Sequence, residues 1–481
     1  MSPRNAPPAR SQRCNLYHRR LLLLCALCTV TVGCVAPERD KLRLEAYSWW
    51  TRPSEKNAFA SVLSIYNSAH QDSEAVNQVT ETSNATEVRA TLTARLLAGA
   101  PPSTFQANAG ADLLRWTAMD TTEAALPSAS RIAPLDGLFQ RTGLSEVLPS
   151  DLYKALQAGP LRLPYAVPLN IHRLNLIYYN TAALSRYRAD HAGQSFLDLA
   201  VLCPKNVDEL LADPKQKLAL KIAVGLRDSF TLTLFALENV LPAIAGATPY
   251  DNASGGTLYD QLLRGNLDEQ EWRAPVFRAL QCVQYLSRSF LDNHDKSWAD
   301  ALNQVEVGEA DFSVMGDWAN GELKRALEGH RVEAQIFPGS EGTFVFTSDT
   351  FPLPVAAPYA KESEALLETL ASVAAQLAFS REKGSIPARA DITTEDVREK
   401  LGQRAAQTRQ DFDSPEVHKS IATSGLFPPY YPDQELSARL TAMTADGASE
   451  ASIEHVIALL RNTLPLLKRW QDRIAEGQQD P

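Results

Sequence analysis

The sequence predicts an α/β protein whose two lobes are joined by three crossing segments, and two observations support this prediction. Strand-like and helix-like stretches alternate along residues 42–110, as in a mostly parallel sheet covered by helices. Three later stretches are polar or irregular between apolar flanks, as expected of chain that crosses a gap: residues 163–180, 344–352 and 383–389. The 481 residues, 44% of them hydrophobic, suffice for more than one lobe.

The first predicted strand ends at two adjacent tryptophans. Residues 42–46 alternate between apolar and polar, which predicts a strand with one buried face. Pro53 suits the first turn of a helix, and apolar residues recur at helical spacing over 59–66. Trp49 and Trp50 therefore lie between a strand and a helix, where α/β folds commonly bind ligands.

Polar residues surround this tryptophan pair. They are Thr51, Arg52, Ser54 and Glu55. An indole face beside hydroxyl and carboxylate groups suits a pyranose, whose C–H face stacks on the ring while its hydroxyls form directional hydrogen bonds. The pattern favours sugar binding, although either tryptophan could instead be a core residue.

The rest of the chain continues the alternation. Further strands are predicted around residues 76–79 and 104–110, with a helix at 85–98 between them. Later amphipathic helices are expected at 208–212, 274–291 and 451–471. An apolar strand from Phe312 ends in Gly316-Asp317-Trp318, which again places a carboxylate and an indole at a strand end.

The crossing segments carry candidate ligand contacts. Asn170, His172 and Arg173 interrupt the first, and Asp349 lies within the second. Gly and Pro in the third, which begins at Lys383, argue against regular structure there. A buried histidine is as readily structural as ligand-binding, so both roles stay open for His172.

The amino terminus reads as a secretory signal. Five arginines and no acidic residue precede an apolar run over 21–32, which is too short to span a bilayer, and Gly33-Cys34 follows. This order resembles a bacterial lipoprotein cleavage site and predicts lipidation of Cys34. Ordinary signal cleavage and a retained anchor are the alternatives.

Charge and cysteine usage narrow the function further. Removing those five arginines from 47 basic residues leaves 42 against 57 acidic ones, which argues against nucleic-acid binding. Outside the signal, the sequence keeps two cysteines, Cys203 and Cys282, and their pairing is left open. No metal-spaced His/Cys cluster, P-loop, GxSxG or HExxH string occurs, so neither a metal nor a cofactor is expected.

Several strings together resemble the glucose-type sugar-binding proteins of bacterial ABC importers, within family 1 of the extracellular solute-binding proteins. They are WWTRPSE (49–55), RLLAGAPPSTFQ (95–106), AVPLNIHR (166–173), MGDW (315–318), PGSEGTFVFTSDTF (338–351) and KGSIPAR (383–389). The resemblance implies a two-lobed periplasmic-binding-protein fold of type II. It also implies a non-enzymatic, exported monomer that closes over a monosaccharide or short saccharide and delivers it to ABC permease subunits.

The resemblance also implies lobe boundaries and site residues. Lobe I would comprise 42–168 and 352–383, and lobe II 173–348 and 388–475. The expected sugar-binding residues are Trp49, Trp50, Glu55, Asn108, His172, Trp298, Asp317, Asp349 and Lys383. Two positions depart from the family pattern: Asn108 stands where relatives carry Lys or His, and the string 420–425 lacks a histidine and has Thr423 instead.

Two other functions remain open at this stage. Glu55, Asp317 and Asp349 could supply the carboxylate pair of a glycoside hydrolase. The histidine missing near Thr423 leaves room for a non-transport lipoprotein that senses sugar or has a structural role.

Overall fold

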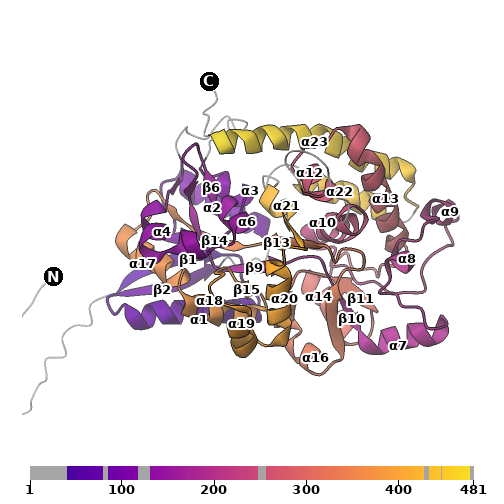
Figure 1. Ribbon diagram of the computed structural model, residues 1–481, viewed down its shortest axis with the longest axis horizontal. Coiled ribbons are helices and arrows are strands. Elements are labelled where there is room, and N and C mark those ends of the chain that lie inside the picture. Colours follow the sequence, from indigo (N-terminus) through magenta and orange to yellow (C-terminus); the bar gives the residue numbers. More distant parts are fainter. Residues whose placement is uncertain are drawn as a thin grey trace, which may run out of the picture. The chain divides into compact units, whose positions relative to one another are not determined.

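The computed structural model describes residues 41–79, 85–117, 130–246, 256–426, 433–445 and 447–476. The predicted signal and Cys34 lie outside the described residues. The two-lobed α/β prediction is confirmed in the unit that begins at Lys41 (Figure 1).

A parallel sheet forms the core of lobe I. Its central strand β1 (Leu42–Ser48) lies between β2 (Ser73–Val79) and β3 (Thr104–Phe105), parallel to both. The alternation predicted for β1 is confirmed, because Leu44 and Ala46 are fully buried. Two helices follow these strands as expected: α1 (Pro53–Ala69) and α2 (Ala85–Leu97).

Lobe I is completed by a much later part of the chain. Helix α1 packs against α17 (Ala360–Leu370) and α18 (Val373–Lys383). Figure 1 shows these helices, indigo and orange, side by side below and beside the sheet. Two distant stretches of sequence thus share one core, as the predicted crossings require.

The sheet of lobe II is antiparallel. Strand β10 (Leu176–Asn180) lies between β11 (Phe312–Val314) and β12 (Val332–Ile336), antiparallel to both. Helix α13 (Glu269–Ser287) and helix α14 (Trp298–Glu306) belong to this lobe. The parallel arrangement predicted from the first 110 residues therefore holds for the sheet of β2, β1 and β3 but not for the sheet of β11, β10 and β12.

The three crossing segments are hydrogen-bonded into small sheets between the lobes. Strand β9 (Asn170–Arg173) lies between β15 (Ile386–Pro387) and β13 (Thr343–Thr347). Strand β14 (Asp349–Pro354) continues directly from β13 and pairs with β8 (Ala166–Pro168). The prediction of no regular structure in the third crossing is wrong at β15, where Ile386 and Pro387 pair with β9 despite the flanking Gly and Pro.

Short elements complete the fold. The other strands are β4 (Ala107–Asn108), β5 (Ile132–Ala133), β6 (Gln157–Ala158), β7 (Leu163–Pro164) and β16 (His418–Ile421). The first helices among them are α3 (Ala111–Leu114), α4 (Asp136–Thr142), α5 (Leu144–Val147), α6 (Ser150–Lys154), α7 (Thr181–Asp190), α8 (Leu199–Leu202), α9 (Val207–Ala212) and α10 (Phe230–Phe235). The later helices are the π-helix η1 (Ala236–Val240), α11 (Leu241–Ala245), α12 (Leu258–Leu263), α15 (Ala319–Glu322), α16 (Lys324–Glu328), α19 (Thr394–Leu401), α20 (Gln403–Asp413), α21 (Thr423–Leu426), α22 (Asp433–Thr444) and α23 (Glu450–Glu476).

Two close approaches tie the lobes together. The long helix α23 packs on α13 and α22 and also reaches β6 of lobe I, which Figure 1 shows as the yellow helix along the top. At Gly110, with φ +91°, an added Cβ would lie 2.1 Å from the carbonyl oxygen of Gly425. Only glycine permits both this backbone conformation and this contact between α3 and α21.

Cys203 and Cys282 form a disulfide, which joins the chain after α8 to α13. Because 79 residues separate them, the bond restricts the unfolded chain considerably. We expect the double variant Cys203→Ser, Cys282→Ser to lose roughly 3 kcal/mol of unfolding free energy in urea titrations. Dithiothreitol should lower the stability of the wild type but not of the variant, and equal stability without reductant would contradict a structural role.

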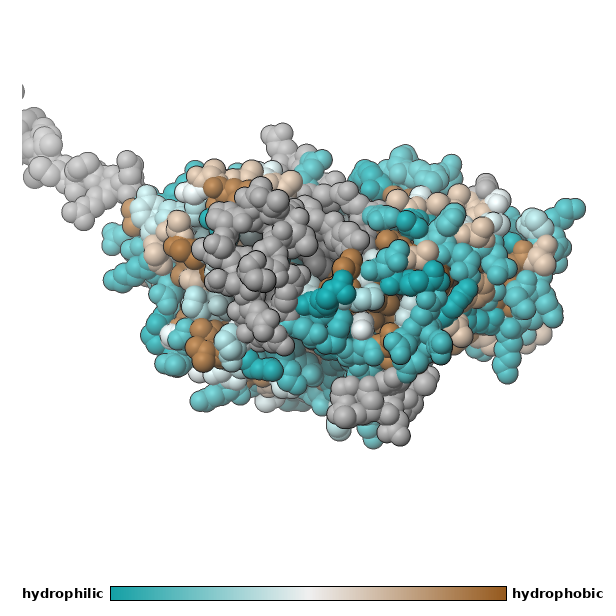
Figure 2. Space-filling model, turned by 90° about the horizontal axis from the view of Figure 1, so that it is seen from above, coloured by the Kyte–Doolittle hydropathy of each residue, from teal (hydrophilic) through white to brown (hydrophobic). Residues whose placement is uncertain are grey.

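Within the described residues, no helix combines the length and apolar character needed to cross a membrane, and no group of His, Cys, Asp and Glu is arranged to hold a metal ion. Figure 2 shows a face on which hydrophilic side chains predominate and apolar ones are scattered. Exposed large apolar residues lie in separate parts of the chain, for example Leu161 between β6 and β7, Phe230 in α10 and Val355 after β14, and such isolated positions are ordinary on protein surfaces.

Candidate functional site

A buried polar cluster lies where the crossing segments meet, and we call it the crossing cluster. Its members are Gln106, Asn170, His172, Asp317 and Asp349, each at most 5% exposed. They come from the β3–β4 junction, strands β9 and β14, and the loop after β11. Sequence analysis predicted three of these residues as sugar contacts, and the structure brings those three together.

His172 occupies the centre of the crossing cluster. Its Nδ1 is hydrogen-bonded to Asp317 Oδ1, and its Nε2 lies 3.2 Å from Asp349 Oδ2. The other carboxylate oxygen of Asp317 accepts the backbone N–H of Arg173 at 3.0 Å. One imidazole therefore joins a carboxylate of lobe II to a carboxylate of the second crossing.

Asp349 is held even more completely. Its Oδ1 accepts from Gln106 Nε2 at 2.7 Å, and its Oδ2 accepts from Asn170 Nδ2 at 3.0 Å. The backbone N–H of Asp349 donates to Asn170 Oδ1 at 2.9 Å, which fixes the orientation of that amide. These bonds fix the second crossing against the first.

The charges of the cluster shift one another's pKa values. Burial alone would lower the pKa of His172, but Asp317 and Asp349 raise it to about 9. Burial acts to raise the pKa of Asp349, yet the hydrogen bond and charge of His172 lower it overall. For Asp317 burial prevails, and the pKa of this carboxyl is raised.

A buried ion pair lies beside the cluster. Lys383 Nζ is 2.5 Å from Glu55 Oε1, and these two side chains are 4% and 11% exposed. The ammonium also lies 5.7 Å from the ring centroid of Trp50 and acts electrostatically on Asp317 and Asp349. The third crossing thereby connects the start of α1 to the crossing cluster.

The loop between β1 and α1 touches lobe II directly. The Arg52 guanidinium lies 5.2 Å from the ring centroid of Trp298, and its Nε lies 3.4 Å from Glu322 Oε2. The hydroxyl of Ser54 donates to Glu322 as well. Trp298 is the first residue of α14, next to the capping residue Ser297, and Arg52 brings the polar loop of lobe I to this predicted site residue of lobe II.

The two adjacent tryptophans have different surroundings. Trp50 is 1% exposed, and its ring centroid lies 4.9, 5.0 and 5.8 Å from those of Phe59, Phe379 and Phe351. The structure thus places Trp50 in the core of lobe I, the alternative that the sequence left open. Trp49 is only partly buried, with Arg89 at 4.9 Å over its ring, and its backbone N–H donates to Gln106 Oε1 at 3.2 Å.

Asn108 lies at the edge of the same region. It pairs with Asp349 between β4 and β14, and its backbone N–H donates to Asp112 at 3.0 Å. The Asp112 carboxylate is paired with Arg89, the residue that covers Trp49. These contacts are made by the backbone of Asn108, so the sugar-binding role of its side chain stays a prediction.

Sequence reasoning did not select three residues that the structure brings to the cluster. Gln106 lies in the strand predicted around residues 104–110 and donates to Asp349, and Trp318 packs edge-on to His172 at 5.3 Å. Thr347 pairs directly with His172 across β13 and β9, so their side chains share a face. Its buried hydroxyl has no hydrogen-bond partner in the described part of the chain. In the sequence, Trp318 could have been selected because it directly follows the predicted site residue Asp317.

Thr423, where the resemblance led us to expect a histidine, has defined partners. Its backbone N–H and its hydroxyl both donate to Glu238 Oε1, at 3.0 and 2.6 Å. Thr423 begins α21, and Glu238 belongs to η1. Thr423 therefore joins α21 to η1 through these two hydrogen bonds.

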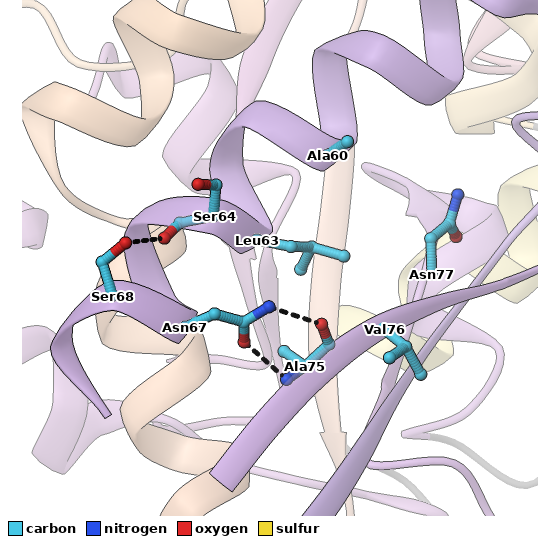
Figure 3. A pocket seen from close by; sticks show the side chains of 8 residues that line it. All are labelled: Ala60, Leu63, Ser64, Asn67, Ser68, Ala75, Val76 and Asn77. Atoms are coloured by element: carbon cyan, nitrogen blue, oxygen red, sulfur yellow. Dashed lines mark hydrogen bonds between the residues drawn. The ribbon is translucent and has the colours of Figure 1, made fainter. Parts of the chain in front are cut away.

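A separate cavity of about 450 Å³, open to solvent, lies between α1 and β2 (Figure 3). It is lined by Ala60, Leu63, Ser64, Asn67, Ser68, Ala75, Val76 and Asn77. Asn67 donates to Ala75 O at 3.1 Å and accepts from Ala75 N at 2.7 Å, so its amide covers part of the open edge of β2. None of the predicted site residues lines this cavity.

A comparison with protein families shows to which family the chain belongs. The model of the bacterial extracellular solute-binding proteins matches residues 62–406, which is more than half of the sequence. The chain belongs to this family. Membership places this solute-binding protein among exported proteins that bind ligands, and it speaks against the glycoside hydrolase alternative.

Relatives of this solute-binding protein support the family assignment. It is 27% identical to an uncharacterized ABC transporter extracellular-binding protein of Pyrococcus horikoshii over 352 residues, 72% of either chain. It is 25% identical to a probable sugar-binding periplasmic protein of Brucella suis, covering 76% of this chain and 80% of the relative. A xylose/arabinose-binding protein of Haloferax volcanii is 24% identical, with coverages of 80% and 77%.

Solved structures confirm the fold of the solute-binding protein. A bacterial solute receptor with a preference for β-D-galactopyranose superposes with a TM-score of 0.66 at 14% identity, covering 89% of this chain and 99% of the receptor. A chitin oligosaccharide binding protein gives a TM-score of 0.62 at 15% identity, with coverages of 90% and 99%. At such identities the likeness shows the two-lobed fold alone.

Proposed function

We propose that this solute-binding protein captures a neutral sugar between its lobes and delivers it to the permease of an ABC importer. The observation that carries the proposal is the crossing cluster together with the adjacent Lys383–Glu55 pair. Carboxylates, an ammonium and amides from both lobes converge there, and sugar hydroxyls can donate to the former and accept from the latter. The names of the relatives from Brucella suis and Haloferax volcanii support a sugar as the ligand.

The balance of charges favours a neutral ligand. Asp317, Asp349 and Glu55 supply three negative charges, against which His172 and Lys383 supply two positive ones. A nearly balanced buried site would pay a large desolvation cost for an ionic ligand without a partner. A monosaccharide or short saccharide brings hydroxyls without net charge, and glucose-type specificity remains part of the proposal.

Hinge closure would couple binding to transport. Lobe I (42–168 and 352–383) would rotate against lobe II (173–348 and 388–475) about the three crossing segments, and a ligand that contacts both lobes stabilises the closed state. Arg52 of lobe I contacts Trp298 and Glu322 of lobe II, and such contacts between lobes would form only when the lobes approach each other. The closed, monomeric protein would then dock on the permease subunits, with lipid on Cys34 keeping it at the periplasmic or outer membrane surface.

The remaining predicted sugar contacts fit this proposal to different degrees. Glu55, Asp317, Asp349 and Lys383 lie in or beside the cluster. Trp49 and Trp298 are partly buried and can present a ring face once Arg89 and Arg52 move aside. Trp50 would support the site from the core beneath Lys383.

A thermal-shift screen tests the function. The mature protein would be heated with pentoses, hexoses and disaccharides, and with sugar acids and amino acids as charged controls. A true ligand at 100 times its Kd should add about 2.7 kcal/mol of stability. We expect a neutral sugar to raise the Tm; a shift given only by charged solutes would overturn the proposal.

A further inference from the structure

His172 has no free ring nitrogen for a ligand. Nδ1 is bonded to Asp317 and Nε2 faces Asp349 at 3.2 Å, and the side chain is 2% exposed. A neutral imidazole carries one N–H, so it can donate to only one of these carboxylates, whereas the imidazolium donates to both. Both ring nitrogens therefore face a carboxylate, which favours the imidazolium, while the atom nearest to Nε2 is Nδ2 of Asn170, at 2.8 Å.

We propose that His172 is a positively charged positioning residue, which holds Asp317 and Asp349 in place for the ligand instead of contacting the sugar itself. This inference rests on the proposed function. It replaces the direct sugar contact that the sequence suggested for His172.

The groups around His172 define its charge environment. Asp317 approaches from the loop after β11 and Asp349 from β14, while Trp318 contacts the ring edge-on at 5.3 Å. Lys383, from the end of α18, acts on both carboxylates and opposes the negative charge around the imidazole. Arg173, the next residue on β9, donates its backbone N–H to Asp317 and pairs its guanidinium with Asp411 at 2.6 Å.

Asn170 gives the neutral ring an alternative partner. Its Nδ2 lies 2.8 Å from His172 Nε2 and 3.0 Å from Asp349 Oδ2. The amide can donate to Nε2 only when that nitrogen carries no proton. Loss of the proton would therefore replace the His172–Asp349 hydrogen bond by one from Asn170 to His172 Nε2. The two buried carboxylates would then lack the positive charge of the imidazolium.

The expected pH dependence follows from the raised pKa. Asp317 and Asp349 raise the pKa of His172 to about 9 against burial, above the ordinary value of 6.5. The folded state then binds more protons than the unfolded state between these two values, so the stability from His172 is complete below pH 6.5 and is lost as the pH rises through 9. Over the same range Asp349 would lose the hydrogen bond from His172 Nε2, and both carboxylates would lose the neighbouring positive charge.

The test compares the wild type with His172→Gln and with the matched control His330→Gln, whose imidazole is 81% exposed and lies outside the cluster. Urea unfolding without sugar is followed from pH 6 to 9.5. We expect the stability of the wild type and of His330→Gln to fall along the same curve, and the curve of His172→Gln to be flatter. Nitrogen NMR of ¹⁵N-histidine in the wild type reads the imidazole pKa directly, so the test does not depend on the folding of a variant.

Sugar affinity is measured on the same proteins with the best sugar of the thermal-shift screen. We expect His172→Gln to bind it about 10-fold more weakly at pH 7, corresponding to about 1.4 kcal/mol, with little further change up to pH 9.5. The inference is overturned if the wild-type imidazole titrates below pH 7, or if His172→Gln binds as tightly as the wild type. Either result would leave the proposed function intact. A screen in which no sugar binds would overturn the proposed function instead. The urea-unfolding curves without sugar would then still show whether His172 is charged.

Discussion

Asp317→Asn is expected to lower the affinity for the transported sugar by at least about 100-fold. In the proposed closed site, the Asp317 carboxylate of lobe II accepts hydrogen bonds from sugar hydroxyls. Hydrogen bonds to a charged group contribute roughly 1.5–3 kcal/mol each. Asparagine keeps the size of the side chain but removes the charge that strengthens those bonds. Isothermal titration with the sugar from the screen measures the loss.

The matched control for this variant is Asp295→Asn, because the side chain of Asp295 is 81% exposed and pairs only loosely with Lys296. It should bind sugar as the wild type does. Asp317 also accepts the backbone N–H of Arg173, so the unfolding free energy of Asp317→Asn is measured in parallel. Affinity within about threefold of the wild type, in a folded variant, would remove Asp317 from the site.

Trp50→Ala should destabilise the protein by about 4 kcal/mol, because truncating a buried tryptophan leaves a large cavity. Three phenylalanine rings surround this indole at centroid distances of 4.9 to 5.8 Å. Sequence analysis proposed Trp50 as a sugar contact and left a core role open, and its burial at 1% exposure supports the core role. Urea unfolding of the ligand-free protein measures the change.

Trp298→Ala is the companion variant for this comparison. Trp298 is only partly buried, at the first position of α14, so its truncation should cost less stability and weaken sugar binding instead. Trp50→Phe should recover much of the stability lost in Trp50→Ala, since an aromatic ring still fills the space. Wild-type stability of Trp50→Ala would contradict the core assignment.

Local signals were sufficient to predict much of lobe I. The start of β1 at Leu42 and the first turn of α1 at Pro53 were predicted correctly, although β1 runs two residues beyond the predicted 42–46, because period-two burial and a proline at the first turn depend on a few neighbours. The crossing segments were also recognisable, since polar residues such as His172 and Asp349 stand inside apolar runs. These features require no knowledge of distant partners.

Long-range packing limited the rest of the prediction. Trp49 and Trp50 look equivalent in sequence, and only Phe351 and Phe379, some 300 residues later, decide which of them is core. His172 finds its partners 145 and 177 residues away, so its position between two carboxylates could not be derived from spacing. The disulfide was left open for the same reason, because its cysteines are 79 residues apart.

Closure of the two lobes around a neutral sugar is tested most directly by a distance between spin labels. Cysteines would be placed at the exposed Ala69 on α1 and Glu328 on α16, with Cys203 and Cys282 kept in their disulfide. Double electron–electron resonance would then compare the ligand-free and sugar-saturated protein. Hinge capture predicts that saturating sugar shortens and narrows the distance distribution, whereas an identical distribution with and without bound sugar would contradict it.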